Sequence, residues 1–233
     1  RLLIAKSKPN KAIEFDTGMG LVTLADEFER LAARDFSQEL EKEGISRRQK
    51  VQIEDAAGAM KMAAVVSGQE VAATAVAFRH LALLAQTKKN DADVWASLQS
   101  SGAIEEVTQQ LQDRLNRMRY WIQSTHFPEE MRINILSQPN LEILGEFTPD
   151  DVKILHALLK EFSNCEWSAK AITAAIPRSI ESIEVPHKWM AYKVAYLSLM
   201  GVEKGPRLAP ILVEMNQEDI IDLLKASIDA LDE

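Results

Sequence analysis

Hydrophobic residues recur at three- and four-residue spacing along most of the chain, which is the period of one face of an α-helix. The clearest run follows Gly102 and lasts about five turns. Its apolar positions are Ile104, Val107, Leu111, Leu115, Met118 and Ile122. No segment alternates convincingly with the period of two typical of a β-strand, and no repeat of fixed length is visible. The pattern therefore predicts an all-α fold.

Polar residues and glycines at the ends of the apolar runs set the expected limits of the other helices. The first run begins at Leu21, with Thr23 as the expected N-cap and Gly44 as the stop. Thr148 before Pro149 is a strong start signal, because a capping hydroxyl precedes a proline and two acids at the positive helix end. Further helices are expected at residues 71–87, 93–100, 167–175, 186–200 and 217–231.

Composition agrees with a helical chain that can bury a sizeable core. The 233 residues include only nine Gly and eight Pro, and aromatic residues make up 6%. The longest apolar stretch, residues 71–85, is interrupted by Arg79 and His80 and is too short for a membrane span. The single cysteine, Cys165, excludes an intramolecular disulfide framework and a multi-cysteine metal site. It favours a reducing, cytosolic compartment.

The net charge of -8 is unevenly distributed, which changes its meaning for a nucleic-acid partner. Residues 1–100 hold 14 basic and 14 acidic side chains. Residues 214–233 hold seven acids against Lys225 and so carry six of the eight excess charges. The rest of the chain is close to balanced, and local basic surfaces could still bind RNA.

Several kinds of catalytic chemistry lack a signature in this sequence. It has no glycine-rich phosphate loop, no paired metal-type histidines and no nucleophile elbow. Its four histidines fall on different expected elements. We therefore identify no catalytic, cofactor-binding or metal-binding residue.

Basic and aromatic residues form one candidate contact surface beside the core stripe of the long helix. At about 100° per residue, Gln110, Arg114, Arg117 and Trp121 fall on one flank. Guanidinium groups pair with phosphates and an indole stacks on unpaired bases, as recognition of single-stranded RNA requires. The alternative is that the arginines solvate the helix and Trp121 packs on a neighbour.

A second candidate surface lies in residues 186–207. The helix there has only Lys188 and Lys193 as charged residues, so most of it should be buried. The loop at residues 201–207 contains two glycines and a proline, and its Lys204 and Arg207 could meet an anion. Trp189 would add a stacking surface. The alternative is a simple helix end followed by the next helix start.

This last region resembles the carboxy-terminal part of class I aminoacyl-tRNA synthetases of the lysyl and glutamyl type. In that family an aromatic-rich helix ends at a glycine, and a loop with Gly-Pro or Gly-Pro-Arg leads to the last helix. The matching residues here are Trp189, Tyr192, Gly201, Gly205, Pro206, Arg207 and the helix from Gln217. The intact Gly-Pro-Arg is closer to class I lysyl-tRNA synthetase. Further similar stretches, in the right order, are residues 12–16, 24–30, 78–81 and 117–122 leading to 127–130.

The resemblance implies a fragment without the catalytic domain. The family's two nucleotide-binding signatures are not found, and Ala5-Lys6-Ser7-Lys8 is only weakly similar to the second. The chain would begin after the Rossmann domain, with connecting helices, similar to a stem-contact region, at 1–101. A helical anticodon-binding domain of the α-helix cage type would follow at 102–233. ATP with magnesium would serve the full-length lysine-tRNA ligase only, and this fragment should be inactive alone.

The resemblance also implies the partners. These are tRNA(Lys) and the protein's own N-terminal catalytic domain, in the cytoplasm, with no membrane and no DNA partner. The residues that we expect to contact tRNA are chosen from helix geometry rather than from the family; they are Arg114, Arg117, Trp121, Lys188, Trp189, Lys204 and Arg207. Two alternatives stay open at this point: a glutamyl-type anticodon-binding domain, and a helical protein-interaction module without an RNA role.

Overall fold

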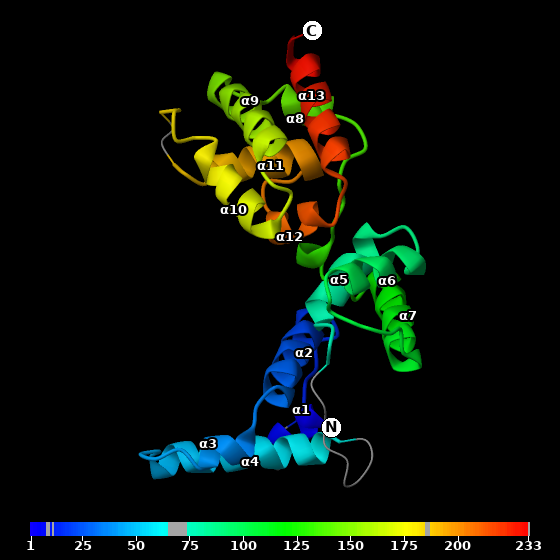
Figure 1. Cartoon of the computed structure of the whole chain (residues 1–233), viewed down its shortest axis with the longest axis vertical. Coiled ribbons are helices and arrows are strands. Elements are labelled where there is room, and N and C mark those ends of the chain that lie inside the picture. Colours follow the sequence, from blue (N-terminus) through cyan, green and yellow to red (C-terminus); the bar gives the residue numbers. More distant parts are fainter. Residues whose placement is uncertain (8–9, 11, 65–73, 185–186, 233) are drawn as a thin grey trace. The chain divides into compact units, whose positions relative to one another are not determined.

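The computed structural model describes residues 1–7, 10, 12–64, 74–184 and 187–232. Within these ranges every regular element is a helix, which confirms the all-α prediction (Figure 1). The α-helices are α1 (Leu2–Lys6), α2 (Met19–Ala32), α3 (Phe36–Leu40), α4 (Arg47–Ala63), α5 (Phe78–Thr87), α6 (Asp91–Ser100), α7 (Gln109–Gln123), α8 (Leu141–Leu144), α9 (Pro149–Asn164), α10 (Ala169–Arg178), α11 (Met190–Met200), α12 (Leu208–Val213) and α13 (Gln217–Asp232). A 3-10 helix, η1, covers Glu129–Met131. None of the described helices has both the length and the apolar character needed to cross a bilayer.

The chain packs into two compact units that are interleaved in sequence. The first unit contains residues 1–82 and 98–127, and the second contains residues 83–97 and 128–233. Helices α5 and α6 are therefore each shared between the units. The expected boundary between residues 101 and 102 divides the chain by function, and it stays a prediction. The packing divides the chain differently and assigns α7 to the first unit.

In the first unit, the run expected as one helix from Leu21 to Gly44 forms two helices, so that prediction is wrong. The side chain of Asp35 accepts a hydrogen bond from the Gln38 amide and starts α3 as a new helix. Thr23 is not the N-cap: it lies inside α2, where its hydroxyl donates to the Met19 carbonyl. Both differences reflect local hydrogen bonding by short polar side chains.

The helix after Gly102 is also shorter than expected. Thr108 accepts a hydrogen bond from the Leu111 amide and caps α7, so Ile104 and Val107 precede the helix. Ile104 is still buried, which explains its apolar character without a helix. The expected helix at 71–87 begins at Phe78, and its residues 71–73 lie outside the described residues.

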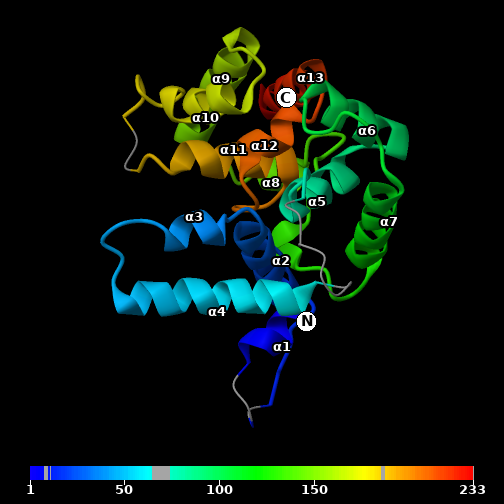
Figure 2. The ribbon, with the colours of Figure 1, turned by 60° about the horizontal axis from the view of Figure 1, so that its bottom comes forward.

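In the second unit, α11 contacts α8, α9, α10 and α13, and Figure 2 shows it beside α8 and α10. Seven of its residues are buried, as expected for this apolar helix. It begins at Met190; residue 186, where the expected helix began, is outside the described part of the chain. Gly201 ends it in the left-handed conformation at φ 69°, and Thr148 caps α9 in a capping box with Asp151. Both end signals are confirmed.

Candidate nucleic-acid interface

The seven residues expected to contact tRNA are divided between the two units. Arg114, Arg117 and Trp121 lie on α7 in the first unit. Lys188, Trp189, Lys204 and Arg207 lie beside α11 in the second unit. We call these sets the α7 cluster and the α11 cluster and describe each within its own unit.

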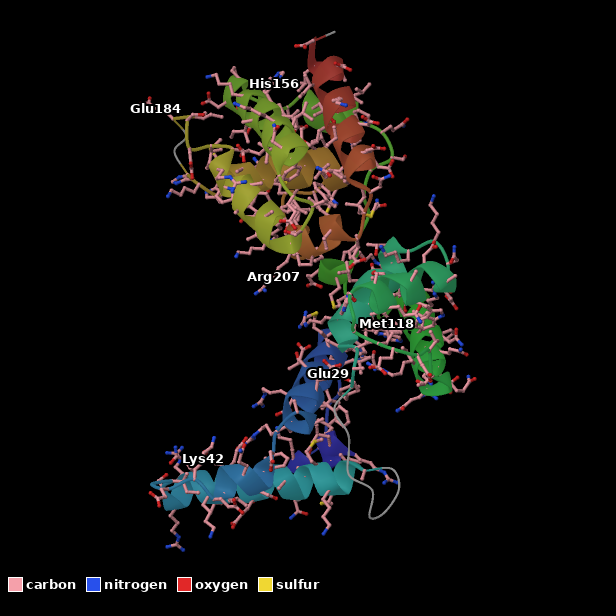
Figure 3. All side chains as sticks on the ribbon, in the orientation of Figure 1. Glu29, Lys42, Met118, His156, Glu184 and Arg207 are labelled. Carbon is pink, nitrogen blue, oxygen red and sulfur yellow. The ribbon has the colours of Figure 1, made fainter. Side chains whose placement is uncertain are left out.

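The α7 cluster surrounds a small, mainly apolar pocket. Its volume is about 210 Å³. The residues that line it are Leu21, Phe78, Leu81, Arg114, Arg117, Met118 and Trp121. Figure 3 marks the position of Met118 on α7. All three predicted residues of α7 thus meet at one site, whereas Gln110 does not contribute to it.

The indole of Trp121 is held firmly in the fold. Its ring centroid lies 5.4 Å from that of Phe78 and 4.8 Å from that of Phe127, with an edge-on arrangement toward Phe127. Its Nε1 donates a hydrogen bond to the Thr17 carbonyl at 2.9 Å. Three contacts therefore already use this side chain inside the first unit. Its stacking on an RNA base stays a prediction.

The two arginines of the α7 cluster have different surroundings. Nη2 of Arg114 donates to the Val76 carbonyl at 2.9 Å and lies 3.9 Å from Glu29 Oε1. Burial lowers the pKa of Arg114, and the charge of Glu29 opposes that shift. Arg117 is exposed and has no hydrogen bond or ion pair with the described residues. Arg117 can therefore contact a phosphate without breaking an interaction with the described residues.

The turn that precedes α2 supports the α7 cluster, because its Thr17 carbonyl accepts the hydrogen bond from Trp121. This role was not predicted from the sequence. The Asp16 carboxylate accepts hydrogen bonds from the amides of Gly18 at 2.8 Å and Gly20 at 2.7 Å. These bonds, mainly that from Gly20, lower the pKa of Asp16. A Cβ on Gly20 would lie 2.9 Å from the Asp16 Cβ, so a glycine is needed there. The signal in the sequence was the Asp-x-Gly-x-Gly spacing just before the apolar pattern.

The α11 cluster is built around an exposed aromatic residue. Trp189, the N-cap of α11, is 56% exposed. Its ring is nearly parallel to that of His187, with an interplanar angle of 17° and centroids 6.2 Å apart. Nζ of Lys193 lies 6.0 Å from the Trp189 ring centroid. Lys188, between the two rings in sequence, is also exposed.

The loop at residues 201–207 folds back along α11. The Tyr196 hydroxyl donates to the carbonyls of Gly205 at 3.2 Å and Pro206 at 2.5 Å. Burial raises the pKa of Tyr196, so this hydroxyl stays protonated and can donate. A Cβ on Gly205 would lie 3.2 Å from Tyr196 Cε1, which indicates close packing of the loop on the ring. The loop conformation is therefore fixed by its contact with the helix.

Exposed cations lie on this loop. Lys204 and Arg207 make no ion pair with the described residues, and the Arg207 side chain points away from the ribbon (Figure 3). Lys193 is paired: its Nζ lies 3.4 Å from Glu203 Oε1. His187, Lys193 and Glu203 were not among the residues expected to contact tRNA. The four-residue spacing of Trp189 and Lys193 on one helix face was the available signal.

A larger groove in the second unit contains none of the predicted residues. Its volume is about 800 Å³, and residues 136–141 line it together with Ala226, Asp229 and Ala230 of α13. Asp229 is the charged residue in this lining, so the groove offers no cation for a phosphate. In the described part of the chain, no three His, Cys, Asp or Glu side chains gather in a way that could hold a metal ion.

Comparison with known proteins relates the chain to one enzyme. No family model matches it. It is 27% identical over 222 residues to a lysine--tRNA ligase of Picrophilus torridus, covering 95% of this chain and 40% of that protein. The lysine--tRNA ligases of Thermococcus kodakarensis and Pyrococcus horikoshii are 28% and 26% identical, and each match covers 97% of this chain and 42% of the relative. The resemblance to lysyl-tRNA synthetases is confirmed. The chain spans about two fifths of the length of these relatives.

Proposed function

We propose that this chain is the tRNA-recognising C-terminal part of a class I lysyl-tRNA synthetase, and that it binds the anticodon of tRNA(Lys). The observation that carries the proposal is similarity to lysine--tRNA ligases over 95–97% of the chain rather than at a single motif. The all-helical structure supports it, because the resemblance implies a helical anticodon-binding domain with connecting helices.

The mechanism that we propose is binding of splayed anticodon bases by stacking, with their phosphates held by exposed cations. Trp189 supplies an exposed ring, and Lys188, Lys204 and Arg207 supply exposed charges in the same unit. Arg117 supplies a further charge in the first unit. Overall attraction should be modest because the net charge is -8, so local contacts would dominate.

In the full-length protein this region would position tRNA for the attachment of lysine. The partner domain in the same protein would activate lysine with ATP and magnesium. The residues of this chain do not fit ATP, since neither the sequence signatures nor a glycine-rich phosphate loop is present. We therefore assign binding and orientation of tRNA to this chain, and catalysis to the catalytic domain, in the cytoplasm.

The test is equilibrium binding of labelled tRNA transcripts at several salt concentrations. A lysine tRNA should bind more tightly than the same transcript with a substituted anticodon, and its affinity should fall as salt increases. Equal, weak and salt-independent binding of both would overturn the proposal and leave a helical protein-interaction module. A glutamate tRNA transcript tests specificity, and tighter binding of that transcript would indicate a glutamyl-type domain.

A further inference from the structure

We infer that His187 and Trp189 form a platform for one unpaired RNA base, and that Lys193 binds the phosphate of the same nucleotide. Glu203 pairs with Lys193 in the absence of RNA and is displaced when RNA binds. This inference rests on the proposed function, because it names the side chains that would hold one nucleotide. It assigns His187, Lys193 and Glu203 to the RNA surface.

The platform is suited to stacking. The rings of His187 and Trp189 are within 17° of parallel, so they present a common orientation to an incoming base. Trp189 is 56% exposed although it is a large apolar side chain at the N-cap of α11. Trp121 and Trp167, in contrast, each direct Nε1 to a backbone carbonyl. An exposed indole with a parallel aromatic neighbour is typical of a base-stacking surface.

Lys193 is positioned to bind the phosphate of a stacked nucleotide. It follows Trp189 by four residues, and its Nζ lies 6.0 Å from the indole centroid. Its side chain is 31% exposed and its Nζ lies over the face of the Trp189 ring, so the ammonium group is partly accessible beside the indole. A base on the ring and a phosphate on the ammonium are the two contacts that a single nucleotide requires.

Glu203 already holds this ammonium group. The distance between Lys193 Nζ and Glu203 Oε1 is 3.4 Å, and the Glu203 side chain is 73% exposed. The loop that carries Glu203 is fixed by the bonds from Tyr196 to Gly205 and Pro206, which keep the carboxylate near Lys193. A phosphate oxygen can replace the carboxylate, and Glu203 then turns into water at little cost because exposed ion pairs are weak.

This exchange would favour RNA with unpaired bases over other polyanions. A phosphate alone gains little, because it must replace a carboxylate that already neutralises Lys193. A nucleotide that also stacks on Trp189 gains the stacking interaction in addition. Glu203 would therefore reduce binding of duplex backbones more than binding of an unpaired loop.

The experiment compares variants of the whole 233-residue chain, with a labelled lysine tRNA transcript as the probe. Glu203→Gln should raise affinity about two- to fivefold, because the competing carboxylate is removed. The matched control is Glu146→Gln, which removes another exposed acid in the same unit. In a Lys193→Ala background, Glu203→Gln should change tRNA affinity no more than this control does. An effect of Glu203→Gln that equals that of Glu146→Gln, or that persists without Lys193, would overturn the role of Glu203.

Stacking has a separate readout. Trp189→Ala should lower affinity by about 5- to 100-fold. Trp189→Phe should keep most of the affinity but lose the part of the transcript-induced quenching of tryptophan fluorescence that comes from Trp189. Wild-type affinity of Trp189→Ala would overturn the platform. If the unmodified chain binds the transcript in a salt-dependent way but all variants behave alike, this inference fails and the proposed function stands; if the unmodified chain does not bind, both fail.

Discussion

The α7 and α11 clusters contain the same types of residue but use them differently. Each combines a tryptophan with lysine or arginine side chains. In the α7 cluster the tryptophan contacts two phenylalanines and donates a hydrogen bond to the Thr17 carbonyl. In the α11 cluster the tryptophan is more than half exposed. The α11 cluster therefore offers an exposed indole to a partner, whereas contact of Trp121 with RNA stays a prediction.

The cations differ in the same way. Arg114 is bound to the Val76 carbonyl and lies near Glu29, so its charge is used inside the first unit. Arg117, one turn further along α7, is exposed. In the second unit Lys204 and Arg207 are exposed on the loop after α11, while Lys193 is paired with Glu203. Arg114 and Lys193 are thus engaged inside their own units, whereas Arg117, Lys204 and Arg207 are exposed and available to a partner.

The largest expected difference is between the two tryptophans. Trp121→Ala should lower the free energy of unfolding of the first unit by about 2 to 4 kcal/mol, because it removes a large side chain that contacts Phe78 and Phe127. Trp189→Ala should change the unfolding of the second unit by less than about 0.5 kcal/mol, as is usual for an exposed site. Urea unfolding followed by circular dichroism measures both. Similar losses for the two variants would contradict the comparison.

The two arginines of α7 should separate stability from binding. Arg114→Ala should cost about 1 to 2 kcal/mol of stability, because the Val76 carbonyl loses its donor and Glu29 loses a nearby charge. Arg117→Ala should leave helix content and stability unchanged but lower tRNA affinity. The slope of log affinity against log salt concentration should fall by about the amount expected for one phosphate contact. Unchanged tRNA affinity of Arg117→Ala would remove the α7 flank from the RNA surface.

The loop of the α11 cluster should depend on one hydroxyl. Tyr196→Phe removes the donor to Gly205 and Pro206 and should cost about 1 kcal/mol, together with faster hydrogen exchange of the loop amides. Tyr192→Phe, on the same helix, is the matched control and should leave exchange in residues 201–207 unaltered. Equal exchange rates in the two variants would show that the hydroxyl does not fix the loop.

The smallest expected effect on stability concerns the turn before α2, whose Thr17 carbonyl accepts a hydrogen bond from Trp121. The folded state lowers the pKa of Asp16 below its ordinary value of 3.8, so ionised Asp16 stabilises the fold above that pH. This contribution is lost as pH falls below 3.8 toward the lowered pKa. Asp16→Asn should therefore lower the thermal midpoint at pH 7, and the difference from wild type should shrink below pH 3.8. A difference that is constant with pH would show that the charge of Asp16 has no role.

The helix ends show how far local signals can be trusted. The capping threonine of α9 and the final glycine of α11 were predicted from their sequence neighbours and are confirmed. The break between α2 and α3 was missed because apolar spacing continues across it while Asp35 starts a new helix. The first turns assigned to the helix after Gly102 were wrong, since Ile104 is buried without being helical.

The candidate surfaces depend on contacts between residues far apart in the sequence, which local signals do not reveal. Sequence spacing identified the α7 flank, and the structure brings Arg114, Arg117 and Trp121 to one pocket. Sequence spacing could not show that Trp121 donates a hydrogen bond to Thr17, which is 104 residues away in the chain. Glu203 was missed because its contact with Lys193 depends on the loop after α11 folding back along the helix. His187 was missed because its nearly parallel arrangement with Trp189 depends on the local backbone geometry before α11. Binding of tRNA by these residues stays a prediction for the experiments described above.

The sequence by itself determined the helical class, several helix ends and the resemblance to lysyl-tRNA synthetases. These properties depend on residue periodicity and on hydrogen bonds between near neighbours, which are visible along the chain. Only the tertiary structure decided which tryptophan is exposed and which arginine is already paired. Burial and pairing depend on residues far apart in sequence, such as Val76 with Arg114 and Phe78 with Trp121, and these residues meet only when the helices pack.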